Sequence, residues 1–120
     1  MKRNVMECLK KERFIAILRH IEPQYAVQAA EALYCGGVRF FEVTFNPGSE
    51  TTITDTQKMI GDIRHAFGDK TYVGAGTVLT KSYAQAAYEA GASFIVSPCT
   101  DKRVIDYTKK KGMLSVPGAY

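Results

Sequence analysis

Glu42 is the residue with the clearest potential for chemistry, because it interrupts a run that otherwise predicts a buried strand. Residues 38–44 read Val-Arg-Phe-Phe-Glu-Val-Thr, and β-branched and aromatic residues at this density are typical of strands. Strand alternation turns Glu42 away from the side that Phe41 and Val43 occupy. Burying an ionised carboxylate without a partner is costly, and a protein can use that cost to obtain an acid that also acts as a base. We expect Glu42 to be either a salt-bridged structural residue or such an acid–base group.

Composition and charge narrow the classes of protein to consider. The chain has 120 residues, of which 46% are apolar and 23% charged, as expected for one compact soluble domain. The net charge of +4 is scattered except at residues 109–111, which we interpret as a solvated helix end, so no concentrated basic face for nucleic acid is expected. The first residues lack a secretory apolar region, and no apolar stretch is long enough to span a membrane. The prediction is a cytoplasmic protein.

Cysteine and histidine residues are too far apart in the sequence to suggest a metal site. Cys8, Cys35 and Cys99 are odd in number and form no pair with metal-ligand spacing. His20 and His65 are isolated and are expected at the surface. We predict no metal and a reducing compartment.

Short apolar runs of strand length alternate along the chain with segments of helical periodicity. Strands are predicted at residues 14–19, 38–44, 71–74, 93–96 and 113–116. Helices are predicted at residues 23–35, 53–67, 81–90 and 101–111. A helix between each pair of consecutive strands requires a parallel sheet with right-handed crossovers. The fold class is therefore α/β.

Two α/β architectures fit this alternation: an open doubly wound sheet and the (β/α)₈ TIM barrel. The first loses its main support because residues 74–77, Gly-Ala-Gly-Thr, are too short for a dinucleotide-binding glycine motif. The barrel places functional residues at the carboxyl ends of its strands. Residues of suitable type lie at the carboxyl ends of all five predicted strands: Arg19, Glu42 with Thr44, Gly76 with Thr77, Ser97 with Pro98, and Pro117 with Gly118.

Several of these segments also carry a resemblance to a known family. The segments are Ala16-Ile17-Leu18-Arg19, Gly36-Gly37-Val38, Glu42-Val43-Thr44, Val73-Gly74-Ala75-Gly76-Thr77-Val78, Ser97-Pro98 and Val116-Pro117-Gly118. In this order they resemble the motif series of the KDPG/KHG aldolase family, from about residue 14 to the last residue. Its enzymes cleave 2-keto-3-deoxy-6-phosphogluconate or 4-hydroxy-2-oxoglutarate.

The resemblance implies a class I aldolase on a TIM barrel that assembles as a homotrimer and needs no metal or cofactor. In such enzymes a lysine forms a Schiff base with the C2 ketone of a 2-keto acid. A glutamate that matches Glu42 moves protons during carbinolamine formation and C3–C4 cleavage. The products are pyruvate and an aldehyde.

The same matching assigns further residues to the substrate. Thr77 would bind the carboxylate end, Arg19 would be an anion partner, and Pro98 would shape the pocket wall. Asn46 departs from the family pattern, because many members have an arginine there that holds the substrate carboxylate. An amide donates hydrogen bonds without charge, so we expect a changed substrate range and a larger role for Arg19.

The larger departure is that the family's Schiff-base lysine lies on the sixth barrel strand, beyond this sequence. We therefore expect residues 1–120 to be the N-terminal portion of a single TIM-barrel domain, with about five strands and four helices, and to be inactive alone. Five strands of a barrel leave two open edges and an exposed apolar inner face. The two interpretations are a fragment of a longer chain and a half-barrel completed by oligomerisation.

Two other functions stay open on the sequence. One is a non-catalytic module that binds a small anion or a partner chain through the same strand ends. The other is a different TIM-barrel chemistry, such as a phosphosugar isomerase or synthase, which the fold alone does not exclude.

Overall fold

The structure is a computed structural model that describes residues 4–119. Its centre is a parallel sheet of five strands in the order β1-β2-β3-β4-β5. The strands are β1 (Ala16–Leu18), β2 (Phe40–Thr44), β3 (Tyr72–Gly76), β4 (Phe94–Ser97) and β5 (Leu114–Pro117). The helices between them are α2 (Ala26–Cys35), α3 (Thr52–Phe67), α4 (Lys81–Ala90) and α5 (Lys102–Lys110), with the short 3₁₀ helices η1 (Pro23–Tyr25) and η2 (Gly68–Lys70). The predicted α/β alternation and parallel sheet are confirmed.

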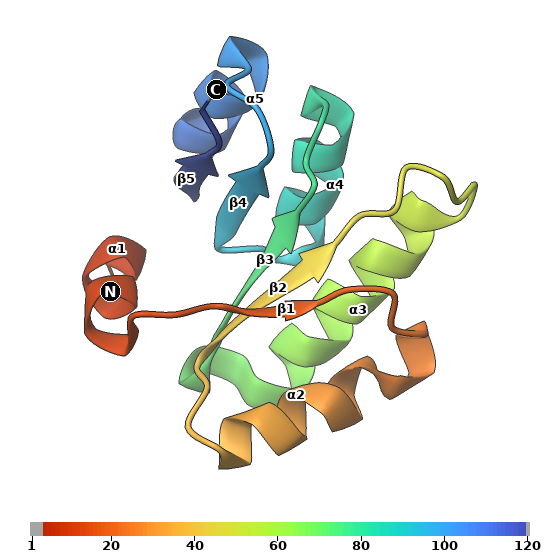
Figure 1. Cartoon of the computed structure of the whole chain (residues 1–120), viewed down its shortest axis with the longest axis vertical. Helices are drawn as coiled ribbons and strands as arrows, with labels where there is room; N and C mark the ends of the chain where they lie inside the picture. Colours follow the sequence, from red (N-terminus) through yellow and green to blue (C-terminus); the bar gives the residue numbers. More distant parts are fainter. Residues whose placement is uncertain (1–3, 120) are drawn as a thin grey trace.

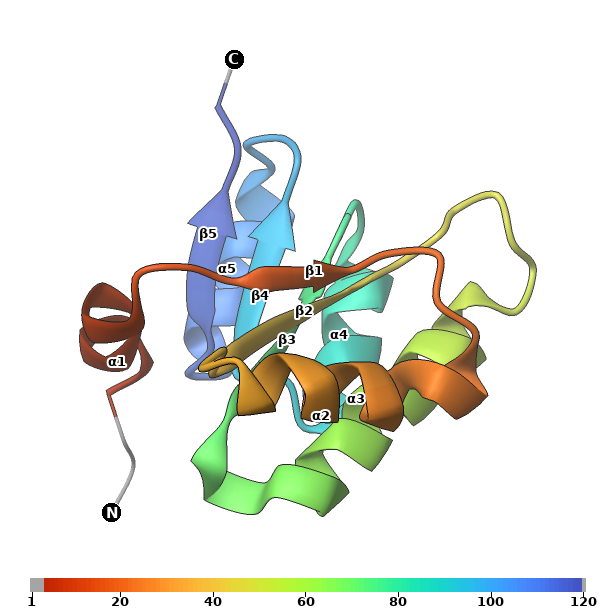
Figure 2. The same cartoon turned by 60° about the horizontal axis from the view of Figure 1, so that its bottom comes forward.

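Helices α2 to α5 lie along one face of a twisted sheet (Figures 1 and 2). The layer between them and the sheet is the main core, to which β2 contributes Phe41 and Val43, both fully buried. The other members of this core with no exposed surface are Ala26, Ala30, Ile60, Ile63, Val73, Ala75, Ala84 and Ala87. Glu42 alternates with Phe41 and Val43 along β2, so it points to the sheet face opposite these helices, as predicted. We call this second face the open face.

A further helix, α1 (Val5–Glu12), precedes the sheet and was not predicted. It lies apart from the other helices, near the ends at which the strands begin (Figure 2). Phe40, Tyr72 and Phe94 of the strands form a second buried cluster. The partly buried residues packed against it are Val5, Cys8 and Leu9 of α1, together with Ile15, Val96 and Leu114. The helix therefore covers one end of the open face.

The sequence does contain a signal for α1. The apolar residues Val5, Cys8 and Leu9 have the spacing of one helix face. Asn4 caps the helix, since its side-chain oxygen accepts a hydrogen bond from the Glu7 N–H at 3.1 Å. The charged residues between these apolar positions interrupt the pattern, which makes the periodicity short and weak.

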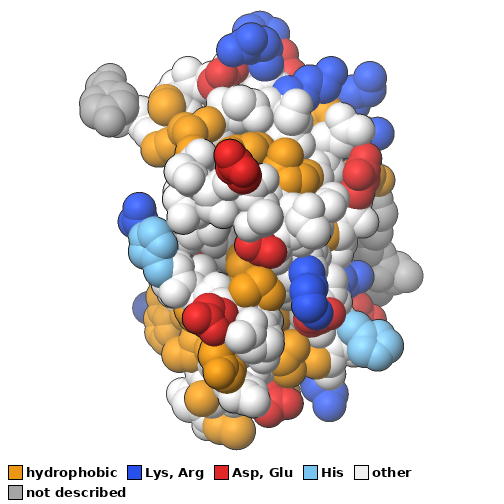
Figure 3. Space-filling view, turned by 90° about the vertical axis from the view of Figure 1, so that its right-hand side faces the viewer, with side chains coloured by type: hydrophobic (Ala, Val, Ile, Leu, Met, Phe, Trp, Pro, Cys, Tyr) orange, Lys and Arg blue, Asp and Glu red, His pale blue; other side chains and the backbone are white. Residues whose placement is uncertain are grey.

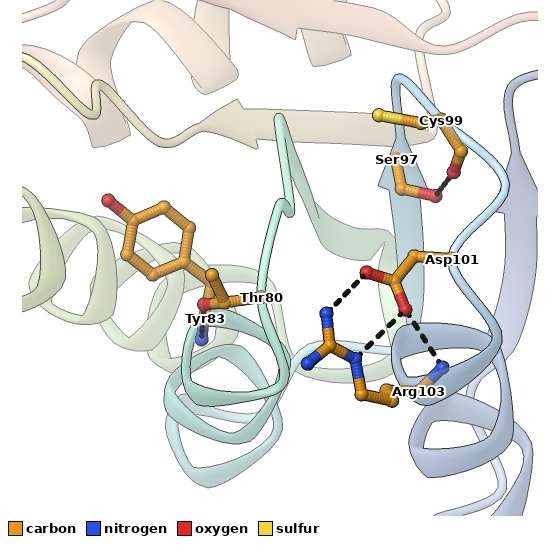
Figure 4. Close-up of polar contacts among 6 residues, drawn as sticks. All are labelled: Thr80, Tyr83, Ser97, Cys99, Asp101 and Arg103. Carbon is orange, nitrogen blue, oxygen red and sulfur yellow. Dashed lines mark hydrogen bonds and ion pairs between the residues drawn. The ribbon is translucent and has the colours of Figure 1, made fainter.

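The beginnings and ends of the other helices follow local chemistry. Thr80 caps α4 by accepting a hydrogen bond from the Tyr83 N–H at 3.1 Å, and Asp101 caps α5 by accepting one from the Arg103 N–H at 2.9 Å (Figure 4). Gly91 ends α4 with a φ of 103°, which favours glycine. Within residues 4–119, no helix combines the length and apolar character that crossing a bilayer requires.

Strand pairing decides where the strands differ from the predicted ranges. β1 is shorter than predicted because only residues 16–18 pair with β2. β3 is longer because its pairing with β2 continues to Thr44 opposite Gly76. The open face beside these strands is only partly covered, and Ile17 in β1 is 60% exposed. The carboxyl ends of all five strands lie at one edge of the sheet, because every pairing is parallel.

Candidate active site

Glu42 is held in a narrow space near the carboxyl end of β2. Its side chain is 7% exposed, and its Oε2 accepts a hydrogen bond from the Thr44 hydroxyl at 2.8 Å. Gly76 on the neighbouring strand provides the room, since a methyl group there would overlap the Glu42 carboxyl group. No ion pair to Glu42 occurs among the described residues. The salt-bridged structural interpretation therefore has no partner in this part of the chain, and the acid–base interpretation stays open.

A pocket of about 150 Å³ opens at the ends of β1, β2 and β3, and Glu42 itself does not line it. Three of the predicted substrate-binding residues, Arg19, Asn46 and Thr77, line it. Thr44 also lines it and links the pocket to Glu42 through its hydrogen bond. The structure therefore brings three of the five predicted site residues to this pocket, and Glu42 is joined to it only through the hydrogen bond from Thr44.

Asn46 is positioned by the loop between β2 and α3. Its backbone N–H donates a hydrogen bond to the Thr52 hydroxyl at 2.7 Å, and its side-chain oxygen accepts one from the Gly48 N–H at 3.2 Å. The second contact is the Asx turn expected of asparagine before Pro-Gly. The side-chain NH₂ remains as the donor that Asn46 can offer to a ligand.

Two pocket residues have an unusual backbone conformation. Thr77 has a φ of 54° and His20 a φ of 57°. Residues other than glycine rarely adopt positive φ, and for a β-branched residue the cost is considerable. Such conformations occur preferentially at functional sites, where the surrounding structure enforces them. Thr77 thus combines a predicted site role with backbone strain.

Pro98 lies apart from this pocket. It is exposed in the loop between β4 and α5 and is not among the residues that line the pocket. The loop is anchored because the Ser97 hydroxyl donates to the Cys99 carbonyl at 3.2 Å (Figure 4). The Gly118 N–H also donates to the Ser97 carbonyl at 2.7 Å. A wall formed by Pro98 stays a prediction for a wider barrel mouth.

The charges around the pocket are few. Arg19 is its cation, and Asp55 lies at the same pocket. No lysine of the described part lines the pocket, and Lys58 and Lys102 instead pair on the helix surface with Asp62 and Asp106. On the face toward which β1 and β2 run, acidic, basic and hydrophobic side chains are interspersed (Figure 3). Residues 4–119 hold no group of three His, Cys, Asp or Glu side chains able to bind a metal ion.

Sequence reasoning missed several pocket residues. His20, Thr52 and Asp55 line the pocket but were given no role. Only Thr52 and Asp55 had a signal, because both lie in the first turn of a helix that follows a strand end. Nothing in the sequence indicated the positive φ of His20.

The comparisons with known proteins agree with one another. A family model for KDPG and KHG aldolase matches residues 5–120. The chain is 38% identical over 114 residues to a 2-dehydro-3-deoxy-phosphogluconate aldolase of Treponema pallidum (strain Nichols), with 95% of this chain and 51% of the relative covered.

Two solved structures extend this similarity to the fold. A native KDPGal structure matches with a TM-score of 0.74 and 33% identity, over 86% of this chain and 47% of that chain. A KDPG aldolase of Legionella pneumophila, solved with pyruvate captured as a covalent carbinolamine intermediate, matches with a TM-score of 0.72 and 29% identity, over 86% and 47%. The chain spans about half the length of the curated relatives it matches. Together, the family match, the parallel sheet and the strand-end pocket establish that this chain belongs to the KDPG and KHG aldolase family.

Proposed function

We propose that this chain supplies the acid–base half of a class I aldolase. The reaction is cleavage of a 2-keto-3-deoxy (phospho)sugar acid or of 4-hydroxy-2-oxoglutarate to pyruvate and an aldehyde. The observation that carries the proposal is that Glu42 is buried, with 7% of the residue exposed, and is linked through Thr44 to a pocket lined by Arg19. Membership of the family supports the same chemistry.

The proposed division of labour assigns proton transfer to Glu42. A lysine outside these 120 residues forms the Schiff base with C2 of the substrate. Glu42 then takes the proton of the C4 hydroxyl while the C3–C4 bond breaks, so the aldehyde leaves and the bond electrons form an enamine. The proton returns to C3 before hydrolysis releases pyruvate. One carboxyl group serves in both directions, as general acid–base catalysis allows.

The proposed substrate contacts use the residues at the pocket. Arg19 binds an anionic group through its fork of donors, Thr77 binds the carboxylate end, and Asn46 donates an uncharged hydrogen bond. Pro98 contributes a wall at the other side of the barrel mouth. A cytoplasmic homotrimer completes the proposal, and free Cys35 and Cys99, both exposed, are consistent with a reducing compartment.

A non-catalytic half-barrel that binds a small anion or a partner chain is the second candidate. The observation in its favour is that no described lysine lines the pocket. The two candidates differ in whether a Schiff base can form in a protein that has the full length of the relatives.

A fusion protein tests the two candidates. The chain is joined to the part of the Treponema pallidum aldolase that its alignment leaves uncovered, then incubated with pyruvate and borohydride and measured by intact mass. We expect one reduced pyruvate adduct on the fusion and none on the 120-residue chain. An adduct on the short chain would contradict the assignment of the lysine to another part of the protein.

The role of Glu42 is tested in the same fusion. Glu42→Gln should lower kcat for cleavage by about 10²- to 10⁴-fold, the usual contribution of a general acid–base group. Glu31→Gln, at an exposed position of α2, is the matched control and should leave kcat unchanged. If the fusion forms the adduct but Glu42→Gln leaves kcat unchanged, the acid–base role of Glu42 is refuted. If the fusion forms no adduct and cleaves no substrate, the binding module is favoured.

A further inference from the structure

Thr44 makes two contacts that the proposed function does not explain. Its hydroxyl donates a hydrogen bond to Glu42 Oε2 at 2.8 Å, and Thr44 is also one of the residues that line the pocket, as are Asn46 and Thr77. Two residues apart on one strand, Thr44 and Glu42 point to the same side of the sheet. Thr44 is therefore the connection between the buried carboxylate and the place where a ligand would lie.

The surroundings of Glu42 leave Thr44 as its polar anchor. Gly76 lies so close that a methyl group there would overlap the carboxyl group, which limits movement toward β3. Thr44 is the hydrogen-bond partner found for the Glu42 side chain among the described residues. Packing thus restricts the position of the Glu42 carboxyl group, and the Thr44 hydroxyl fixes its orientation.

We propose that Thr44 is a positioning residue, which holds Oε2 of Glu42 so that Oε1 is the oxygen that exchanges protons. A neutral hydroxyl suits this task, because it can donate to Oε2 whether the carboxyl group is ionised or protonated at Oε1. An ammonium or guanidinium group in the same place would oppose protonation of the carboxylate. The group can therefore stay in one orientation through both halves of a proton-transfer cycle.

The alternative is that Thr44 only forms part of the pocket wall. In that case its hydroxyl would affect binding of the ligand and not the orientation of Glu42. The kinetic part of this proposal rests on the proposed aldolase function, whereas the orientation of Glu42 can be measured without any activity.

The first measurement uses the 120-residue chain itself. Side-chain ¹³C relaxation of Glu42 is compared in the original chain, in Thr44→Val, which has nearly the same shape without the hydroxyl, and in Thr44→Ser, which retains it. We expect the side-chain order parameter to fall below about 0.6, the range of flexible groups, in Thr44→Val alone. An unchanged order parameter in Thr44→Val would overturn the proposal.

The second measurement uses kcat and KM of the fusion protein. We expect Thr44→Val to lower kcat about tenfold with KM nearly unchanged, and Thr44→Ser to restore most of the loss. Thr108→Val is the matched control, since Thr108 is fully buried and its hydroxyl donates to the Val104 carbonyl at 2.7 Å, on α5. A rise in KM at constant kcat would show a wall residue and overturn the proposal. If the original fusion has no activity, the proposed function fails, and the relaxation data still decide whether Thr44 positions Glu42.

Discussion

Replacing Gly76 with alanine tests whether the space for Glu42 is as tight as the structure shows. The three atoms nearest to the added Cβ all belong to the Glu42 side chain, and its Cγ would lie at only 2.8 Å. Overpacking of a filled site costs about 1–3 kcal/mol. Since Glu42 is 7% exposed and held by Thr44, we expect Gly76→Ala to lower the free energy of unfolding by about 2 kcal/mol, near the middle of that range.

A double-mutant cycle isolates the cause of this loss. Glu42→Ala removes all three atoms that the new methyl group would meet. Gly76→Ala should therefore cost little in the Glu42→Ala background, with a coupling energy of at least about 1 kcal/mol between the two sites. Urea unfolding, followed by circular dichroism, gives the four free energies.

The helix glycine Gly61 is the control for the Gly→Ala change itself. Nothing lies within 4 Å of a Cβ added at Gly61. Gly61→Ala should therefore stabilise the chain by about 0.5–1 kcal/mol through helix propensity. Equal costs of Gly76→Ala with and without the Glu42 side chain would refute the steric argument for the site.

Two other predictions concern the strained loop and a charged helix cap. At Thr77, whose φ is 54°, Thr77→Gly should be more stable than Thr77→Ala by about 1 kcal/mol. At the control position Ser82, exposed in α4, the alanine variant should instead be more stable than the glycine variant by about 1 kcal/mol. The same order of stability at both positions would contradict strain at Thr77. The hydrogen bond from the Arg103 side chain lowers the pKa of the Asp101 carboxyl group, so Asp101 should stabilise the fold above its unfolded pKa and lose that contribution as the pH falls through its folded pKa. When unfolding is measured at several pH values, the free energy of unfolding should fall less toward acid pH in Asp101→Asn than in the original chain. The same pH dependence in both proteins would refute this contribution.

The order of the strands and helices could be predicted because its signals are local. Apolar runs, caps such as Thr80 and Asp101, and stops such as Gly91 act within a few residues. The α-helix that was not predicted, α1, had such a signal at Asn4. The strand limits were less accurate, since pairing with β2 decides where β1 begins and where β3 ends.

The candidate site was predictable only in part. Parallel pairing places the strand ends at one edge, so Arg19, Asn46 and Thr77 were expected together and do line one pocket. Pro98 also follows a strand, yet it lies outside that pocket. The sequence pattern could not predict this, because it does not give the distance between strand ends that are not neighbours in the sheet. The hydroxyl contact of Thr44 and the conformation of Thr77 depend on packing and loop geometry.

The sequence by itself determined the α/β class, the parallel connections and the isolated acid in β2, since these follow from residue types and their spacing. Tertiary structure decided that Glu42 lies against Gly76, that Thr44 holds one of its oxygens and that Thr77 adopts a positive φ. The physical reason is that strand register and side-chain packing join residues that are far apart in the chain. The role of Gly76 on β3, which is to leave room for the Glu42 carboxylate, follows only from the register that places it beside β2.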